Sequence, residues 1–334
     1  MKRKIRNIVL IAVVALTVGY IYSQNGKQKE KQEQYIFRLA EVHSAEYPTT
    51  KANEYFAKLV EERTEGRIKI KVYADGVLGE EIDVIEGLQY GGIDFARISI
   101  APIAEYVEEM NSLMLPYLYA DGEHMWRVLT SPLGEKMLES VNAAGLVGLA
   151  WYDAGARSYY LNTPIDGIED LKGKKIRVQT SSLMFAMCEE LGATPKSMPE
   201  SRINQGVIEK TIDGAENNIS TYEAFGHYES CKYYLLDEHT RIPEMIVASD
   251  ITMKKLSEED QEIIKQCGVE AGEYERVLWN QAEQAAIHRL EEKGVIFITP
   301  SEEMKQEARV KNEDLYNEFA GKYKAIIDQI QEMK

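Results

Sequence analysis

The sequence predicts an α/β protein with two domains. Short segments with alternating apolar residues are interleaved with segments of helical periodicity, which is typical of sheets covered by helices. The chain has 334 residues, more than one hydrophobic core usually covers. Its apolar content of 44% is ordinary for a globular protein, so the body of the chain has enough apolar surface for packed cores.

The first third of the body supports this prediction most clearly. The segment 35–44, "YIFRLAEVHS", alternates and predicts a strand. A helix is predicted over 49–66, where apolar residues recur at helical spacing, and a strictly alternating strand follows at 67–75. A second helix at 80–92 and a third strand at 93–100 complete a β-α-β-α-β series, which is the pattern of an α/β sheet.

The rest of the chain continues in the same way. A serine and an aspartate at 257 and 260 form a capping pattern before a helical segment that extends to 294. The other predicted elements are a helix at 125–145, a strand at 146–154, a helix at 183–192, a helix leading into a short strand at 200–218, strands at 244–253 and 295–299, and a helical tail.

The segment "KKIRVQT" at 174–180 also predicts a strand, preceded by one helical turn that Gly173 ends. Ile176 and Val178 lie on one face of this strand, while Arg177 and Gln179 lie on the other. A guanidinium is costly inside a sheet unless an anion meets it. The sequence therefore raises the question of which anion meets Arg177.

Net charge and cysteine spacing exclude several classes of protein. The formal net charge of −16 argues against a nucleic-acid partner, which needs a basic surface. It also means that any anion site must be locally positive. Cys188, Cys231 and Cys267 have no short spacing, so we expect buried thiols and neither a zinc site nor a redox pair. No metal or cofactor is predicted.

The N-terminus predicts export from the cytoplasm. Four basic residues within the first six precede an uncharged apolar run at 8–22, as in a signal segment. No clear A-x-A cleavage site follows, so residues 1–22 are expected to form a signal or an uncleaved membrane anchor. Residues 23–34 are polar and predict a linker. The body is then extracytoplasmic, in the periplasm or at the outer face of the cytoplasmic membrane.

Motifs of common enzymes are missing or incomplete. "GIEDLKGKK" is close to a phosphate-binding loop, but five residues separate its glycines where four are needed. Lys175 stands where Ser or Thr should, and a strand follows where a helix is required. There is no G-x-S-x-G elbow and no G-x-G-x-x-G after a strand. The prediction is that the protein is not an enzyme and has no catalytic residues.

Three polar residues could instead meet at one crevice. Arg157 follows the strand that contains "WYDAGA", Arg177 lies on the next strand, and Asn217 follows the strand "TIDGAE". In open α/β sheets, ligands bind outside the carboxyl ends of the strands. Two guanidinium groups and an amide suit a carboxylate. Ordinary structural interpretations stay open: Arg177 can pair with a structural acid, Arg157 can be solvated, and the Asn-Asn pair can mark a turn.

The chain resembles the solute-binding proteins of tripartite ATP-independent periplasmic (TRAP) transporters, the DctP-like family, from about Phe37 to Phe319. The resemblance rests on "FRLAEVHSAEYP", "FAKLVEERTEGRIKIKVYADGVLGEE", "GGIDFARIS", "LPYLYADGEH", "PIDGIEDLKGKKIRV", "LGATP", "DGAENN" and "DEHTRIPE", which occur in the order of the family. The segments "ARIS", "AWYDAGARS", "DGAENN" and "DEHTRIPE" are similar in sequence to those of the family branch that includes sugar-acid binders.

This resemblance implies a two-lobed α/β fold like that of periplasmic binding proteins, with an interlobe cleft and a long connecting helix. Lobe 1 would comprise 35–154 plus 243–281, and lobe 2 would comprise 155–242 plus 282–334. A helix beginning near Ser257 would pass between them.

The resemblance also implies site residues. The arginine of "KIRV", here Arg177, would hold the ligand carboxylate, with Arg157 as the second arginine and Asn217 as the asparagine of "DG-x-EN". We expect Arg177 to be buried and unpaired until the ligand supplies its counter-charge. The sequence departs from the common family pattern where many members have proline, at Gln179 and Asn218.

The far side of the crevice should be rich in polar and aromatic groups if the ligand is a sugar acid. The candidates are Arg97, Asn218, His43, Tyr152, Glu41 and Ser99.

The function implied is that of an extracytoplasmic, monomeric receptor that delivers a small organic acid, a hexuronate or related sugar acid, to the membrane subunits of a TRAP transporter. The alternatives are a binder of C4-dicarboxylates or α-keto acids, an enzyme on acidic sugars, and a sensor that presents its ligand to a membrane kinase.

Overall fold

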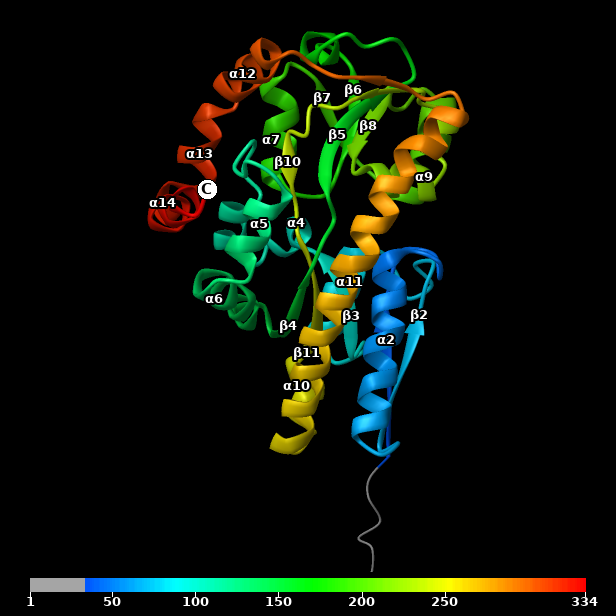
Figure 1. Cartoon of the computed structure of the whole chain (residues 1–334), viewed down its shortest axis with the longest axis vertical. Helices are drawn as coiled ribbons and strands as arrows, with labels where there is room; N and C mark the ends of the chain where they lie inside the picture. Colours follow the sequence, from blue (N-terminus) through cyan, green and yellow to red (C-terminus); the bar gives the residue numbers. More distant parts are fainter. Residues whose placement is uncertain (1–33) are drawn as a thin grey trace, which may run out of the picture.

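The computed structural model describes residues 34–334, which form two β-sheets with helices packed around each (Figure 1). The predictions of a signal or anchor at 1–22 and of a linker at 23–34 fall outside the described residues, apart from Gln34. In the described part, no helix combines the length and apolar character needed to cross a membrane.

The first sheet has five strands in the order β2-β1-β3-β11-β4. Strands β1, β2 and β3 are parallel, and β11 runs antiparallel to both β3 and β4. Their bounds are β1 Tyr35–Ala40, β2 Ile68–Tyr73, β3 Phe95–Ser99, β4 Leu146–Tyr152 and β11 Glu244–Ser249. The alternation of apolar residues predicted the first three strands correctly, and helix α2 (Pro48–Arg63) covers this sheet as expected.

The second sheet follows the order β12-β9-β5-β8-β6-β7, with β10 paired to β5. Strand β6 is parallel to β7 and β8, whereas β5 is antiparallel to β8. The bounds are β5 Ala156–Leu161, β6 Lys175–Val178, β7 Thr194–Ser197, β8 Gly214–Asn217, β9 Tyr233–Leu235, β10 Thr240–Arg241 and β12 Ile296–Ile298. A sheet in each half confirms the expected two-lobed α/β fold.

Helix α11 (Glu258–Glu292) connects the two halves (Figure 1). The Ser257 hydroxyl accepts a hydrogen bond from the Asp260 amide, so the predicted cap is confirmed. A Cβ atom on residue 268 would lie only 2.9 Å from Leu149 Cβ. Glycine at this position therefore lets the helix pack closely against strand β4. Farther along, Arg289 pairs with Glu223 of helix α9 (Ile219–Ala224), which follows strand β8 of the second sheet.

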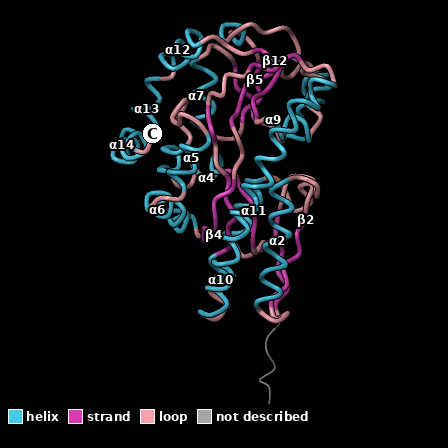
Figure 2. The backbone as a smooth tube through the Cα atoms, viewed as in Figure 1, coloured by secondary structure: helices cyan, strands magenta, loops and turns pink. Residues whose placement is uncertain are grey.

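The C-terminal segment returns from the second sheet to the first lobe (Figure 2). It forms α12 (Glu302–Lys311), α13 (Glu313–Ala320) and α14 (Lys324–Glu332). His124 Nε2 on α5 (Gly122–Leu129) lies 2.8 Å from the Ile330 carbonyl oxygen of α14. We propose 35–154 plus 243–281 as lobe 1 and 155–242 plus 282–334 as lobe 2, with α14 packing across the boundary between them.

The predicted helix over 125–145 is wrong as a single element. Ser131 caps a new helix, α6 (Pro132–Ser140), whose first residue is proline. Proline suits a first helical turn but breaks a continuous helix, so α5 ends at Leu129. The remaining helices are α3 Glu81–Gln89, α4 Ile100–Ile103, α7 Ser182–Glu190, α8 Ile203–Ile208 and α10 Asp250–Met253, and short 3-10 helices lie at Glu108–Leu113, Val141–Ala144, Ile168–Leu171, Glu200–Arg202, His227–Glu229 and Gly321–Tyr323.

The apolar cores lie between the sheets and these helices. Phe56, Phe95 and Tyr152 belong to a core between the first sheet, α2 and α11. Cys188, Cys231 and Cys267 are buried free thiols, as expected from their spacing.

Candidate functional site

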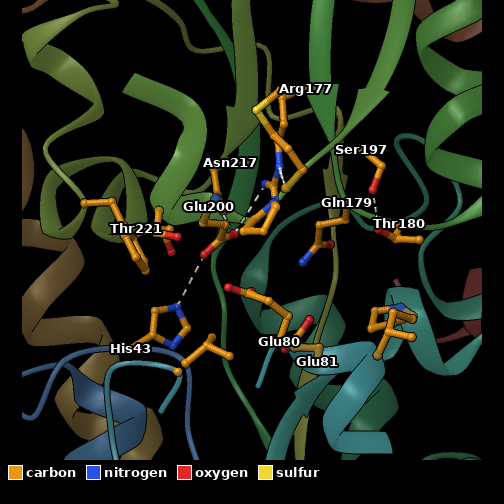
Figure 3. Close-up of a pocket in the computed structure, with 18 of the residues that line it drawn as sticks. His43, Glu80, Glu81, Arg177, Gln179, Thr180, Ser197, Glu200, Asn217 and Thr221 are labelled. Atoms are coloured by element: carbon orange, nitrogen blue, oxygen red, sulfur yellow. Dashed lines mark hydrogen bonds and ion pairs between the residues drawn. The ribbon is translucent and has the colours of Figure 1, made fainter. Parts of the chain in front are cut away.

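A cavity of about 430 Å³ lies between the two sheets and is lined from both lobes (Figure 3). This size is within the roughly 300–1,000 Å³ of small-molecule sites. Chain segments just beyond β1 and β3 approach it from one lobe, and β6, β8 and the loop after β7 approach it from the other. The site thus lies near the carboxyl ends of parallel strands, where ligands bind in open α/β sheets.

Arg177 lies on β6 and lines the cavity, as predicted (Figure 3). It is 5% exposed, and its Nε donates a 2.9 Å hydrogen bond to the Met198 carbonyl oxygen. Its Nη1 stands 3.5 Å from Glu200 Oε1, while Nη2 makes no hydrogen bond within residues 34–334. The expectation that Arg177 is unpaired before a ligand binds is therefore wrong, because Glu200 supplies a protein carboxylate beside it.

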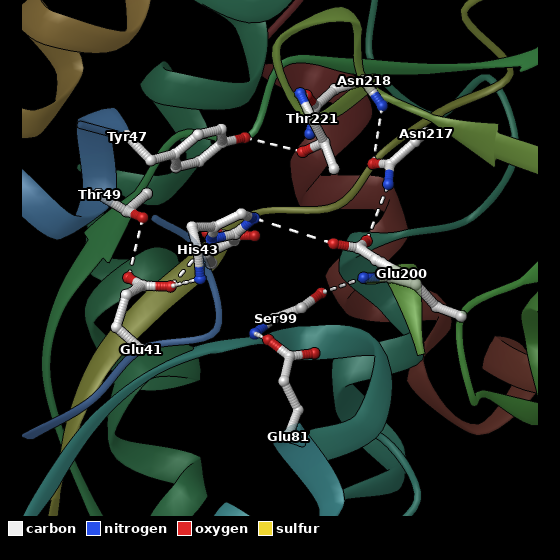
Figure 4. Close-up of polar contacts among 12 residues, drawn as sticks. Glu41, His43, Tyr47, Thr49, Glu81, Ser99, Glu200, Asn217, Asn218 and Thr221 are labelled. Atoms are coloured by element: carbon white, nitrogen blue, oxygen red, sulfur yellow. Dashed lines mark hydrogen bonds and ion pairs between the residues drawn. The ribbon is translucent and has the colours of Figure 1, made fainter. Parts of the chain in front are cut away.

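Glu200 begins a short 3-10 helix, Glu200–Arg202, directly after β7 and Pro199. Its Oε1 accepts a 2.8 Å hydrogen bond from Asn217 Nδ2, and its Oε2 is 3.9 Å from His43 Nε2 of the other lobe (Figure 4). Burial alone would raise the pKa of the Glu200 carboxyl, but the charges of Arg177, His43 and Arg157 and the hydrogen bond from Asn217 lower it to about 2. Glu200 is thus an ionised carboxylate.

Asn217 and Asn218 both line the cavity, as predicted. Asn217 is the last residue of β8, and its Oδ1 accepts from the Asn218 amide. Asn218 caps helix α9, because its Oδ1 accepts a 2.7 Å hydrogen bond from the Thr221 amide. The pair therefore lies at a strand end and a helix N-cap and not in a turn, and Asn218 combines its capping role with a place on the cavity wall.

Arg157 lines the cavity but lies within β5 and not after a strand end. Its Nε and Nη2 donate to Glu216 Oε2 and Oε1 at 2.5 and 2.9 Å. Burial alone would lower the pKa of Arg157, but the Glu216 charge raises it. Arg157 is therefore a fully ionised side chain already held by a protein carboxylate, and solvation is excluded as its role.

Arg97 on β3 also lines the cavity, and it is saturated by protein acids. Its Nη2 donates to Glu41 Oε1 at 2.9 Å, and its Nη1 donates to Glu81 Oε1 at 2.7 Å and Glu244 Oε1 at 3.0 Å. Ser99, another candidate, is buried, and its hydroxyl oxygen lies 3.3 Å from Gln179 Nε2. Arg97 thus holds three carboxylates of the first lobe together on that side of the cavity.

His43 faces Glu200 across the cavity, whereas Glu41 lies behind it (Figure 4). The ring of His43 stacks on Tyr47 with 3.9 Å between the centroids, and its Nδ1 lies 2.8 Å from Glu41 Oε1. Glu41 is completely covered and is not among the cavity-lining residues. His43 is the candidate on this side with an unbonded ring nitrogen directed to the other lobe.

Tyr152 does not line the cavity, so its assignment to the site is wrong. It has no exposed surface and packs in the core beneath the first sheet. Its hydroxyl donates a 3.1 Å hydrogen bond to Asn53 Oδ1. The alternation of β4 turns this side chain toward α2 and away from the cleft.

The cavity wall is not locally positive, in contrast to the expectation from the net charge. Its described lining includes three guanidinium groups, and each lies beside at least one protein carboxylate. Burial raises the pKa of Glu244 to about 7 despite the lowering effect of Arg97. The acidic residues of the lining are Asp75, Glu80, Glu81, Glu200 and Glu244.

Sequence reasoning missed Glu200 and Glu244 and gave Gln179 no role. Gln179 follows β6, where the family resemblance implied proline, and that departure was the available signal. Its Nε2 reaches Ser99 of the other lobe, while its buried Oε1 has no partner within residues 34–334. The buried Oε2 of Glu244 is likewise unpartnered among these residues. Both side chains line the cavity and retain unused acceptor capacity.

Direct hydrogen bonds hold the two lobes together around the cavity. The hydroxyl groups of Tyr47 and Thr221 are 2.7 Å apart (Figure 4). Ser182, at the start of α7, donates through its amide and hydroxyl to Glu105 at 2.7 and 3.0 Å. With Gln179 and Ser99, these pairs connect the lobes at three places and describe a closed arrangement.

Comparison with known proteins agrees with this architecture. Residues 39–322 match the family described as bacterial extracellular solute-binding protein, family 7, or DctP. A solute-binding protein from Chromohalobacter salexigens is 35% identical over 280 residues, covering 83% of this chain and 82% of that protein.

Two solved structures are similar over most of the chain. A TRAP periplasmic solute-binding protein from a Bradyrhizobium species, in complex with D-galacturonate, has a TM-score of 0.87 and 38% identity. The match covers 89% of this chain and 100% of that one. A TRAP protein from Pseudomonas putida with bound D-glucuronate has a TM-score of 0.86 and 34% identity, covering 89% and 97%. The chain therefore belongs to the DctP family of TRAP periplasmic solute-binding proteins, which bind solutes and are not enzymes.

Proposed function

We propose that this protein captures a hexuronate or a closely related sugar acid outside the cytoplasm and delivers it to the membrane subunits of a TRAP transporter. The observation that carries the proposal is Arg177, which lines an interlobe cavity with its Nη2 unbonded among the described residues. A guanidinium in this position can donate two parallel charge-assisted hydrogen bonds to a carboxylate. Arg177 is the proposed carboxylate-binding residue.

The rest of the wall suits the hydroxyl groups of a sugar. Gln179 and Glu244 have buried acceptor oxygens without a partner among residues 34–334, and His43 Nε2 makes no hydrogen bond within that range, with Glu200 Oε2 3.9 Å away. A sugar hydroxyl both donates and accepts hydrogen bonds, so groups of this kind can meet several positions of the ring. The similar structures with galacturonate and glucuronate support the same class of ligand.

A C4-dicarboxylate or α-keto acid is the alternative ligand, and the geometry favours it less. A dicarboxylate needs a second available cation facing Arg177. In the described cavity wall, Arg97 is bonded to three acids and Arg157 to Glu216. A second carboxylate would have to displace one of these buried pairs, which are strongly hydrogen-bonded.

A thermal-shift screen with D-glucuronate, D-galacturonate, aldonates and succinate tests the proposal. A ligand in thousandfold excess over its Kd raises the free energy of unfolding by roughly 4 kcal/mol. We expect hexuronates to give the largest increase in Tm. A large shift with succinate and none with any sugar acid would reject the proposed ligand class while leaving the family assignment intact.

A further inference from the structure

We infer that Glu200 is an internal competitor for the ligand: its carboxylate holds Arg177 and Asn217 in the free protein, and an incoming carboxylate must displace it. This inference rests on the proposed function in that the ligand is taken to be a carboxylate. It adds a residue that sets the affinity and selectivity of the site, and it answers the question of which anion meets Arg177.

The contacts of Glu200 are those expected for a bound carboxylate ligand. Its Oε1 receives the Asn217 amide at 2.8 Å and faces Arg177 Nη1 at 3.5 Å. Its Oε2 points toward His43 in the opposite lobe, at 3.9 Å (Figure 3). A ligand carboxylate held by Arg177 and Asn217 would require the same donors, so Glu200 and the ligand exclude each other there.

The Arg177–Glu200 contact is loose enough to be exchanged. A charge-assisted N–H···O bond is usually about 2.7–2.9 Å long, whereas this contact measures 3.5 Å. The Glu200 backbone is anchored separately, because its carbonyl oxygen lies 3.1 Å from His227 Nε2. The side chain can therefore rotate away without moving the chain, and it is already 15% exposed to the cavity.

Charge repulsion explains why Glu200 should leave and not share Arg177 with the ligand. Glu80 and Glu81 face the same cavity from the other lobe. Partial burial raises the pKa of Glu80, and the negative charge of Glu200 raises it further. A ligand carboxylate between Arg177 and an unmoved Glu200 would add a fourth anion to Glu80, Glu81 and Glu200, and Arg177 would have to balance both the ligand and Glu200.

The variant Glu200→Gln tests the inference, because it keeps the shape and the Asn217 hydrogen bond but removes the charge. We expect D-glucuronate or D-galacturonate to bind Glu200→Gln about tenfold more tightly, the value of one hydrogen bond to a charged group. Glu80→Gln is the matched control. It removes a charge from the same cavity without touching Arg177 or Asn217, and should tighten binding about threefold at most.

The outcomes of titration calorimetry separate the explanations. Tightening of about tenfold in Glu200→Gln with about threefold or less in Glu80→Gln supports displacement. Weaker or unchanged binding overturns it, because Glu200 would then contact the bound sugar or play no part. Equal tightening in both variants also overturns it, since a general charge effect would suffice.

An independent measurement keeps this test separate from the proposed function. In Glu200→Gln, the Arg177 guanidinium lacks its counter-charge, so acetate should raise the Tm of this variant more than chloride does at equal ionic strength. Wild type should show no such difference. If no sugar acid binds either protein, the proposed function fails, and the acetate comparison alone decides the role of Glu200: a response equal to that of wild type overturns it.

Discussion

Replacing Arg177 by alanine should reduce ligand affinity far more than folding stability. Truncating one partner of a buried, hydrogen-bonded ion pair usually loses roughly 2–5 kcal/mol of binding free energy. This loss corresponds to a Kd about thirtyfold to several thousandfold higher. Arg177→Lys should also bind poorly, because an ammonium group keeps the charge but lacks the planar pair of donors.

The contacts of Arg177 limit how far this substitution can lower the free energy of unfolding. The alanine variant loses the 2.9 Å bond to the Met198 carbonyl oxygen, and Glu200 loses its guanidinium but keeps the Asn217 amide. The Glu200 side chain is 15% exposed and can gain water. We therefore expect a fall of about 1–2 kcal/mol in the free energy of unfolding, near that of one or two hydrogen bonds.

Calorimetric titration with D-glucuronate and chemical denaturation of the same variant measure the two effects. Arg202→Ala is the control, because Arg202 lies on the same 3-10 helix as Glu200, is exposed and does not line the cavity. It should change neither quantity appreciably. Unchanged ligand affinity in Arg177→Ala together with a large fall in denaturation midpoint would refute the proposal that Arg177 binds the carboxylate.

Three further predictions concern lobe closure and pH. Tyr47→Phe removes the 2.7 Å hydrogen bond to Thr221 that joins the lobes, so Kd for D-glucuronate should rise roughly fivefold, the effect of about 1 kcal/mol; an unchanged Kd in calorimetry would exclude a role in closure. Burial raises the pKa of Glu275 well above its usual value, and the nearby charge of Asp153 adds to this. The folded state therefore binds the proton more strongly, and the free energy of unfolding falls as pH rises above about 4.3, the pKa of Glu275 in the unfolded chain. Glu275→Gln should flatten the dependence of the denaturation midpoint on pH. A pH dependence parallel to that of wild type would contradict this prediction. Burial opposes the charged form of His239, but two neighbouring carboxylates raise its pKa to about 9. The contribution of charged His239 to the free energy of unfolding should therefore be full below about pH 6.5 and be lost as pH rises through 9. Over that range the denaturation midpoint of His239→Gln should fall less than that of wild type, and an equal fall would count against this prediction.

Local patterns predicted the elements that depend on local interactions. The strands at Tyr35–Ala40, Ile68–Tyr73 and Phe95–Ser99 follow from alternation, and helix α11 follows from its cap at Ser257. Strand β7 (Thr194–Ser197) was not predicted, because it is a short edge strand containing proline. Elements of this kind are specified by their neighbours more than by their own sequence.

In the site, the sequence predicted the type of group that meets Arg177 but not the residue that supplies it. The residues near Arg177 predicted that a carboxylate would meet it, and one interpretation held that this carboxylate belonged to the protein. Glu200 was not identified, because it lies on the loop after β7, 23 residues farther along the chain. The acids around Arg97 come from three separate segments, one of them 147 residues away. Such pairs depend on the assembled sheets and leave no periodic signal in the sequence.

We propose that Arg177 and the polar groups around it in the cavity select a hexuronate. The most direct test is titration calorimetry of the wild-type protein with D-galacturonate, D-glucuronate and succinate under identical conditions. We predict saturable binding of at least one hexuronate, with a lower Kd than for succinate. Succinate binding much more tightly than both hexuronates would contradict the claim.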